Sequence, residues 1–405
     1  MRNIERSSDM LHALLRNKVF IIVTIADLIQ QLGIWIRNMA LLFYVMDLTE
    51  NDPVAVSLLT VLEYLPILLF SLIGGALADR WEPKRTMIMG DLLSAVSIAG
   101  IVLSMQAGYG KTIFAAVFIS AVITQFSWPS SSVMFKRHIP EQQVTTAISI
   151  SAALASLFVI IGPIIGTLIF TWLGIYASLT VLVILFLCSA AMQTALPKVS
   201  QRTSYAAVTL SHQFKKSYSY LLNNKNLRAL VVGLTLLELG LGLIQPLEVY
   251  IVMDRLGLEK EAIQWLYGLY GIGMFAGGVL SARMIHKIQA TNSTSAGFCV
   301  LALLIISEAL SIWFLFTGSI RFMAGIVAAF LQVVIEAFLI RFTAERYIGI
   351  INGTISTLVV TGTLLGSSMA GVLMKHTSLL FVYCLASGIV FAAGIYCRKL
   401  ELNNK

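Results

Sequence analysis

Long apolar runs, each of roughly 20 residues, recur along the whole chain and are separated by short polar connections. A run of that length crosses about 30 Å of hydrocarbon as a helix. Lipid suits this chain as a solvent, because 58% of its 405 residues are hydrophobic and only 12% are charged, about half the share in globular domains. We therefore expect an all-α membrane protein with twelve transmembrane helices, near residues 19–46, 54–78, 87–107, 112–135, 144–170, 174–196, 227–253, 261–283, 293–316, 319–343, 347–374 and 378–397.

Basic residues are distributed unevenly between the connections. If the N-terminus is cytoplasmic, 22 of the 28 Lys and Arg lie on the cytoplasmic side, five lie on the other side, and Arg37 lies within a span. This asymmetry follows the positive-inside rule and predicts that both termini are cytoplasmic. No small-residue cleavage site follows the first apolar run, so we expect no cleavable signal peptide. The net charge of +8 therefore reflects topology and attraction to lipid headgroups, and nucleic acid is not an expected partner.

Short motifs recur at an offset close to half the chain length. Asn17-Lys18 opens the first predicted span, and Asn224-Lys225 opens the seventh, 207 residues later. Gly74-Gly75-Ala76-Leu77 recurs as Gly277-Gly278-Val279-Leu280 with an offset of 203 residues. Such offsets predict a duplicated six-helix unit, an architecture found in transporters. The expected parts are an N-terminal six-helix bundle, a cytoplasmic basic linker and a C-terminal six-helix bundle, at 1–196, 197–226 and 227–405.

The linker carries six basic residues, if Arg228 is counted with it, and no acidic residue. Its apolar residues include Leu210, Phe214, Tyr218 and Leu221, which follow helical spacing. This pattern favours a short amphipathic helix on the cytoplasmic membrane surface. A disordered basic loop is the alternative.

The connection between the second and third spans reads Gly75-x-x-x-Asp79-Arg80-x-x-x-Lys84-Arg85. Gly75 would allow close approach of two helices, and the Asp79 charge can interact with the positive N-terminal end of another helix. The sequence therefore predicts a conformational latch at this connection. The alternative is that these charges only enforce topology.

This connection, together with Met87-Ile88-Met89-Gly90-Asp91 after it, resembles the signature loop of the major facilitator superfamily. The similarity is greatest to bacterial drug exporters such as macrolide efflux pumps and enterobactin exporters, and it extends through Phe118–Pro129 and Ile139–Gln143. The resemblance implies a secondary exporter in the bacterial cytoplasmic (inner) membrane that exchanges protons for a small amphipathic compound, such as a drug-like molecule, a macrolide or a siderophore-like metabolite, by alternating access. We expect a monomer. Proton-coupled uptake, or a receptor or assembly factor that does not transport, are the alternatives.

The fifth predicted span contains Gly162-Pro163-Ile164-Ile165-Gly166. Proline removes a backbone hydrogen bond, and the glycines permit a kink and tight packing. The pattern resembles the Gly-Pro-x-x-Gly antiporter motif of exporters, although simple helix packing would also explain it. One departure from the family concerns Ser120, because drug antiporters of this resemblance often carry an arginine there that is linked to proton coupling.

Charged residues inside the predicted spans are functional candidates, since each costs several kcal/mol in lipid unless it faces a cavity or a partner. Asp27, Glu238 and Glu336 are carboxylates near mid-membrane, and we predict that they couple transport to protons, Asp27 and Glu238 foremost. The alternative is that they are permanently paired structural groups. Arg37 and Glu63 lie at matching depths on neighbouring spans and are predicted to form an ion pair or gate.

The resemblance implies that spans one, four, seven and ten line a central cavity. An apolar cavity with few polar anchors suits amphipathic compounds. The aromatics Tyr267 and Tyr270 are further candidates, whereas Glu248 and Glu308 receive no assigned role. The predicted substrate cavity residues are Gln31, Trp35, Gln125, Phe126, Trp128, Gln245 and Gln332.

Enzymatic function is not expected. The sequence lacks a Gly-x-x-x-x-Gly-Lys-Ser/Thr phosphate-binding loop. Its five histidines lie at predicted loops or termini, so a buried catalytic dyad is not expected, and the four cysteines follow no metal-ligand spacing. We therefore predict no catalytic residue, no cofactor and no metal.

Overall fold

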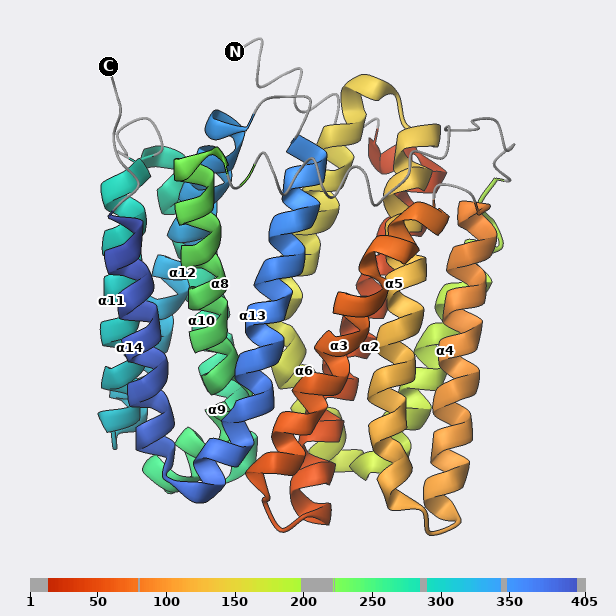
Figure 1. Cartoon of the computed structure of the whole chain (residues 1–405). Helices are drawn as coiled ribbons and strands as arrows, with labels where there is room; N and C mark the ends of the chain where they lie inside the picture. The colour runs from red at the N-terminus through yellow and green to blue at the C-terminus, as the bar shows by residue number, and fades with distance from the viewer. Residues whose placement is uncertain are drawn as a thin grey trace. The chain divides into compact units, whose positions relative to one another are not determined.

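The computed structural model describes residues 14–78, 81–197, 221, 223–284, 290–343 and 348–398, which form long helices joined by short connections (Figure 1). The long helices are α2 (Lys18–Leu48), α3 (Pro53–Ala78), α4 (Pro83–Gln106), α5 (Ile113–His138), α6 (Glu141–Gln193), α8 (Lys225–Ile244), α10 (Ile263–Met284), α11 (Ala290–Leu310), α12 (Phe314–Phe342), α13 (Ile348–His376) and α14 (Leu379–Cys397). The short elements are η1 (Gly110–Thr112), η2 (Gln245–Leu247), α9 (Glu248–Tyr250), η3 (Ile251–Arg255) and η4 (Lys260–Ala262).

Ten helices in the described residues are long and apolar enough to cross a membrane. The fifth and sixth predicted spans both lie within α6, whose 53 residues divide into two helical arms at Gly174. Gly174 has a φ of 70°, a conformation that glycine adopts without steric cost. The ninth predicted span corresponds to a shorter apolar helix, Thr294–Leu310. The all-α fold class is confirmed, while the exact number of crossings stays a prediction.

The chain divides into two compact units, which are described separately. Unit 1 comprises Met1–Tyr44 and Leu65–Ser204, and unit 2 comprises Val45–Tyr64 and Tyr205–Lys405. The proposed division at a linker between residues 197 and 226 stays a prediction. Most of that linker, including Leu210, Phe214, Tyr218 and Leu222 of the expected amphipathic helix, lies outside the described residues.

The repeated Asn-Lys motif has the same structural role in both units. The Asn17 side-chain oxygen caps α2 by accepting the backbone N–H groups of Val19 and Phe20 at 2.9 and 3.2 Å, while the Asn17 amide donates to the His138 carbonyl at the end of α5. Asn224 caps α8 in the same way and donates to the Phe342 carbonyl at the end of α12. Equivalent helix ends are therefore joined in each unit, as duplication predicts.

Glycines allow α10 and α12 of unit 2 to pack at very short range. A Cβ at Gly273 would lie 2.0 Å from the Phe322 carbonyl oxygen, and one at Gly325 would lie 2.1 Å from the Tyr270 carbonyl oxygen. Small residues of this kind create contact between membrane helices where no hydrophobic force acts between them. This close contact therefore holds α10 and α12 in one register relative to each other.

The seventh predicted span, 227–253, corresponds to the candidate span Lys225–Arg255, in which the type of helix changes along the length. The helix α8 ends at Ile244, and the chain continues through η2, α9 and the π-helical turn η3. Pro246 explains the end, because its ring lacks a backbone donor and clashes with the preceding turn.

The segment that joins α2 to α3 packs within unit 2. Asp47 pairs with Lys260, and Asp52 pairs with Lys375 at 3.3 Å. The Tyr250 hydroxyl donates to the Asn51 carbonyl at 2.9 Å. Polar contacts therefore fix this connection against η3, η4 and α13.

Candidate functional site

Two carboxyl groups lie in the interior of unit 1. Asp27 on α2 forms a hydrogen bond with the Ser131 hydroxyl on α5 and lies within electrostatic range of Asp91 on α4. A hydroxyl can donate to an ionised carboxylate or accept from a protonated one. Asp27 can therefore keep this hydrogen bond in both protonation states, which is what a proton-exchanging group requires.

Asp91 is a buried carboxyl group to which the sequence gave no separate role. Its side chain accepts hydrogen bonds from Gln30 Nε2 at 2.8 Å and Gln193 Nε2 at 2.9 Å, and the residue is 2% exposed. Amide groups rather than a cation satisfy it, in the part of the chain that the structure describes. A lone aspartate in the apolar run of α4 was the available signal, but its amide partners are 61 and 102 residues away.

Arg37 supplies a buried guanidinium group in unit 1. Its Nη1 donates to Ser120 Oγ at 2.6 Å, and its Nε donates to Asn38 Oδ1 at 3.1 Å. In drug antiporters of this resemblance the cation is often an arginine on the fourth span, at the position of Ser120. Here Arg37 on α2 contributes a cation that contacts Ser120. The pairing of Arg37 with Glu63 stays a prediction, since Glu63 belongs to unit 2.

The Gly-Pro-x-x-Gly motif lies where α6 packs against α2. Gly162, Pro163 and Gly166 are all buried. A Cβ at Gly162 would lie 2.3 Å from Trp35 Cδ1, and one at Gly166 would lie 2.7 Å from the Trp35 carbonyl oxygen. The motif therefore creates a close helix contact on the side of α2 that carries Trp35, whereas its antiport role stays a prediction.

Gly166→Ala should destabilise the protein, because the backbone carbonyl of Trp35 cannot move aside as a flexible side chain could. We expect the free energy of unfolding to fall by about 1–3 kcal/mol, measured by denaturant titration in detergent micelles. Gly100→Ala on α4 is the control, since a Cβ there meets nothing within 4 Å. Equal effects from the two substitutions would contradict the packing argument.

The predicted latch is only partly described. Gly75 lies within α3, and Asp79 and Arg80 lie outside the described residues. Lys84 Nζ donates to the carbonyl oxygens of Thr194 and Leu196, each at 2.6 Å, and so satisfies backbone groups after the end of α6. Arg85 pairs with Glu82 at 2.6 Å. A latch function for this connection stays a prediction.

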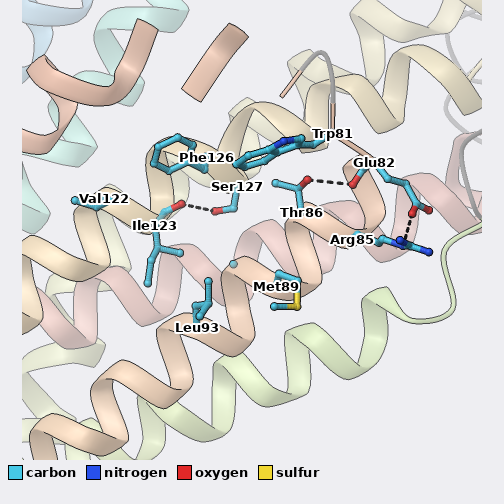
Figure 2. Close-up of a pocket in the computed structure, with 11 residues that line it drawn as sticks. Trp81, Glu82, Arg85, Thr86, Met89, Leu93, Val122, Ile123, Phe126 and Ser127 are labelled. Carbon is cyan, nitrogen blue, oxygen red and sulfur yellow. Dashed lines mark hydrogen bonds and ion pairs between the residues drawn. The ribbon is translucent and has the colours of Figure 1, made fainter. Parts of the chain in front are cut away.

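An apolar pocket of about 560 Å³ lies between α4 and α5 in unit 1 (Figure 2). Its volume falls in the range of small-molecule sites. The rings of Trp81 and Phe126 lie 6.0 Å apart at one wall, and the Glu82–Arg85 ion pair lies at one end of the pocket. The lining residues are Trp81, Glu82, Arg85, Thr86, Met89, Gly90, Leu93, Val122, Ile123, Phe126 and Ser127.

The predicted cavity residues of unit 1 are only partly brought together. Phe126 lines the pocket, Trp35 packs against Gly162, and Gln31 and Gln125 are half-buried. The side chain of Trp128 lies outside the described part of the chain. Among the described side chains, Phe126 is thus the one predicted cavity residue that lines this pocket, and the predicted central substrate cavity stays a prediction.

In unit 2, Glu238 on α8 accepts a hydrogen bond from the Thr363 hydroxyl on α13 at 3.0 Å. This hydroxyl–carboxyl pair resembles the contact between Asp27 and Ser131 in unit 1. Two other predicted groups are more open. Glu336 is exposed beside Gln332, with 3.5 Å between Oε1 and Nε2, and Gln245 is exposed with its amide 3.3 Å from the Tyr64 hydroxyl.

Glu248, Glu308 and Arg321 form a buried triad in unit 2 that the sequence interpretation missed. Arg321 Nη1 lies 2.7 Å from Glu248 Oε1, and Arg321 Nε lies 2.7 Å from Glu308 Oε1. Arg321 was counted among the charges outside the membrane, because it lies near the start of α12. Glu248 and Glu308 had no assigned role and lie at matching depth in the predicted spans. These two acids could have indicated that a buried cation lies between them.

The chain resembles known membrane transporters over most of its length. The Major Facilitator Superfamily pattern matches residues 19–316. The uncharacterized MFS-type transporter YkuC of Bacillus subtilis (strain 168) is 23% identical over 303 residues, which cover 72% of this chain and 70% of that protein. Macrolide efflux protein A of Streptococcus pyogenes is 27% identical over 251 residues, covering 60% of this chain and 61% of that protein.

Solved structures show the same fold. The crystal structure of the nucleoside transporter NupG superposes with a TM-score of 0.76 and 13% identity, covering 96% of this chain and 100% of that chain. Within the described residues, no group of three or more His, Cys, Asp or Glu side chains could hold a metal ion. Because the family match spans more than half of the sequence, the protein is a multi-pass membrane transporter rather than an enzyme, and it belongs to the major facilitator superfamily.

Proposed function

We propose that the protein is a proton-coupled exporter of a small amphipathic compound. The observation that carries the proposal is that α4 and α5, which line the apolar pocket of unit 1, also hold buried Asp91 and Ser131, the hydrogen-bond partner of half-buried Asp27. Gly90 and Ser127 line the pocket. Asp91 directly follows Gly90 in the chain, and Ser131, the hydrogen-bond partner of Asp27, lies one helical turn after Ser127.

Proton exchange in this proposal occurs at Asp27 and Glu238, with Glu336 as a more exposed third group. An ionised carboxylate in a low-dielectric interior is costly without a cation, so protonation is favoured when water is excluded. A substrate that enters the site changes the solvation of the carboxyl group and favours proton release. The Ser131 and Thr363 hydroxyls keep each carboxyl group oriented through this change.

Two observations support export rather than uptake. One relative is a macrolide efflux protein, which suggests a macrolide-like substrate. The second observation is the Gly162-Pro163-Ile164-Ile165-Gly166 motif, which packs against α2 and resembles the antiporter motif of exporters. We further propose that the protein works as a monomer in the bacterial cytoplasmic membrane with both termini in the cytoplasm, consistent with the 22 basic residues assigned to that side.

Transport into everted membrane vesicles tests the proposal directly. Vesicles that contain the protein and have an acidic lumen should accumulate a radiolabelled macrolide, and a protonophore should release it. Vesicles without the protein provide the control. Accumulation that occurs only in right-side-out vesicles with an acidic exterior would replace export with proton-coupled uptake.

A further inference from the structure

The triad of Glu248, Arg321 and Glu308 brings together charges from three helices of unit 2. Glu248 lies on α9, Glu308 near the end of α11, and Arg321 about two turns after the start of α12. The side chains are 12%, 5% and 7% exposed, respectively. Water is therefore largely excluded from all three groups.

The formal charges of the triad do not balance. Two carboxylates and one guanidinium group give −2 + 1 = −1 when all three are ionised. An uncompensated buried charge costs several kcal/mol. One bound proton would make the triad neutral and remove this cost.

No second cation compensates the triad in the part of the chain that the structure describes. The charged groups that act on Glu308 are Arg321 and Glu248, whereas Arg255 Nη2 donates to the Leu310 carbonyl at 3.4 Å. Tyr267 and Tyr270 on α10, and Tyr383 on α14, lie within electrostatic range of the triad. These phenols carry no charge when protonated. Glu238, which lies within electrostatic range of Tyr270, adds a further negative charge and does not compensate the triad.

The two carboxyl groups of the triad differ in their hydrogen bonds. Glu248 interacts with Arg321 and also with the Tyr267 hydroxyl, and it is the less buried of the two. Both features favour its ionised form. Glu308 accepts a hydrogen bond from Arg321 Nε at 2.7 Å and is the more buried of the two carboxyl groups. Glu308 is therefore the better position for a proton.

An unused hydroxyl group lies beside Glu308. Tyr383 is 0% exposed, and its hydroxyl has no hydrogen-bond partner among the described residues, although Glu308 is its foremost charged neighbour. This hydroxyl can accept a hydrogen bond from a protonated carboxyl group or donate a hydrogen bond to an ionised carboxylate. Arg321 Nη2 is likewise buried without an acceptor in the described chain.

We propose that the Glu248–Arg321–Glu308 triad is a proton-binding site of unit 2, with the proton carried by Glu308. The site is separate from Asp27 and Glu238, and the inference does not depend on the substrate or the direction of transport. Release of the proton leaves a buried net charge of −1, so release requires access of water or a movement of α9, α11 or α12. The triad thereby links protonation to the packing of these helices.

Infrared difference spectroscopy during a pH change tests this assignment on the full chain in lipid nanodiscs. The wild-type protein should show carbonyl-stretch bands of buried protonated carboxyl groups that shift in heavy water, one of them from Glu308 in addition to any from Asp27 and Glu238. Glu308→Gln should lose the Glu308 band and keep the others. Glu248→Gln should lose the Glu308 band too, because Arg321 and an ionised Glu308 would then balance without a proton.

Glu259→Gln is the matched control, since Glu259 is an exposed glutamate of unit 2 just before η4 and its loss should leave the Glu308 band intact. A wild-type spectrum in both Glu308→Gln and Glu248→Gln would overturn the proposal. If Glu308→Gln does not fold, the Glu248→Gln spectrum decides alone. The measurement does not involve transport, so a failure of export would leave this result unaffected.

Discussion

Asp27→Asn should abolish accumulation driven by a pH gradient while substrate binding remains measurable. Asparagine keeps the size of the side chain and can still form a hydrogen bond with Ser131, but it cannot exchange a proton. Without coupling, the gradient has no differential effect on the two conformations, and the substrate should only equilibrate across the membrane. Vesicle accumulation and binding to the purified protein, measured on the same preparation, separate the two effects.

Asp47→Asn provides the matched control for Asp27→Asn. Asp47 lies on the same helix and is exposed, and its partner is Lys260. An exposed ion pair contributes only about 0–1 kcal/mol, so transport should be nearly unchanged. Glu238→Gln should act like Asp27→Asn or shift the pH optimum. Full pH-driven export by the Asp27→Asn, Glu238→Gln double variant would refute the assignment and direct attention to Glu336 or Glu63.

Features with a local physical cause could be predicted from the sequence. Apolar runs predicted the helical segments, because span length follows from bilayer thickness. The Asn17-Lys18 and Asn224-Lys225 repeat marked real helix caps, since an asparagine side chain satisfies the first free N–H groups of a helix. The Gly162-Pro163 motif marked a tight contact, because a Cβ would not fit there.

Features that depend on distant partners could not be predicted. The pairing of Arg37 with Ser120 joins residues 83 positions apart. It depends on how α2 is rotated about its axis, which the sequence does not show. Asp91 and Gln193 meet for the same reason across 102 positions. Hydropathy predicted the seventh span but not the change of helix type within it, which Pro246 could have indicated.

Arg321 illustrates a different difficulty. A basic residue near a helix end can extend toward water and report topology, or it can be held inside by acids. Position alone does not distinguish these cases. Whether Arg321 is buried depends on Glu248 and Glu308, which are 73 and 13 residues away and approach Arg321 only after the helices pack.

Arg321→Met should be among the most destabilising single substitutions in unit 2. Methionine fills much of the arginine volume but leaves Glu248 and Glu308 without their shared cation. Removal of one partner from a buried ion pair costs about 3–5 kcal/mol. The free energy of unfolding, measured by denaturant titration in detergent micelles, should fall by this amount near neutral pH.

The triple variant Glu248→Gln, Glu308→Gln, Arg321→Met separates lost charge balance from lost packing. It removes all three charges and should recover most of the stability, because a neutral cluster of similar volume avoids the uncompensated carboxylates. Lower pH should also reduce the loss in Arg321→Met, since protonation neutralises both acids. If the single and triple variants are equally unstable and insensitive to pH, Arg321 acts through packing alone, and the charge argument for the triad is wrong.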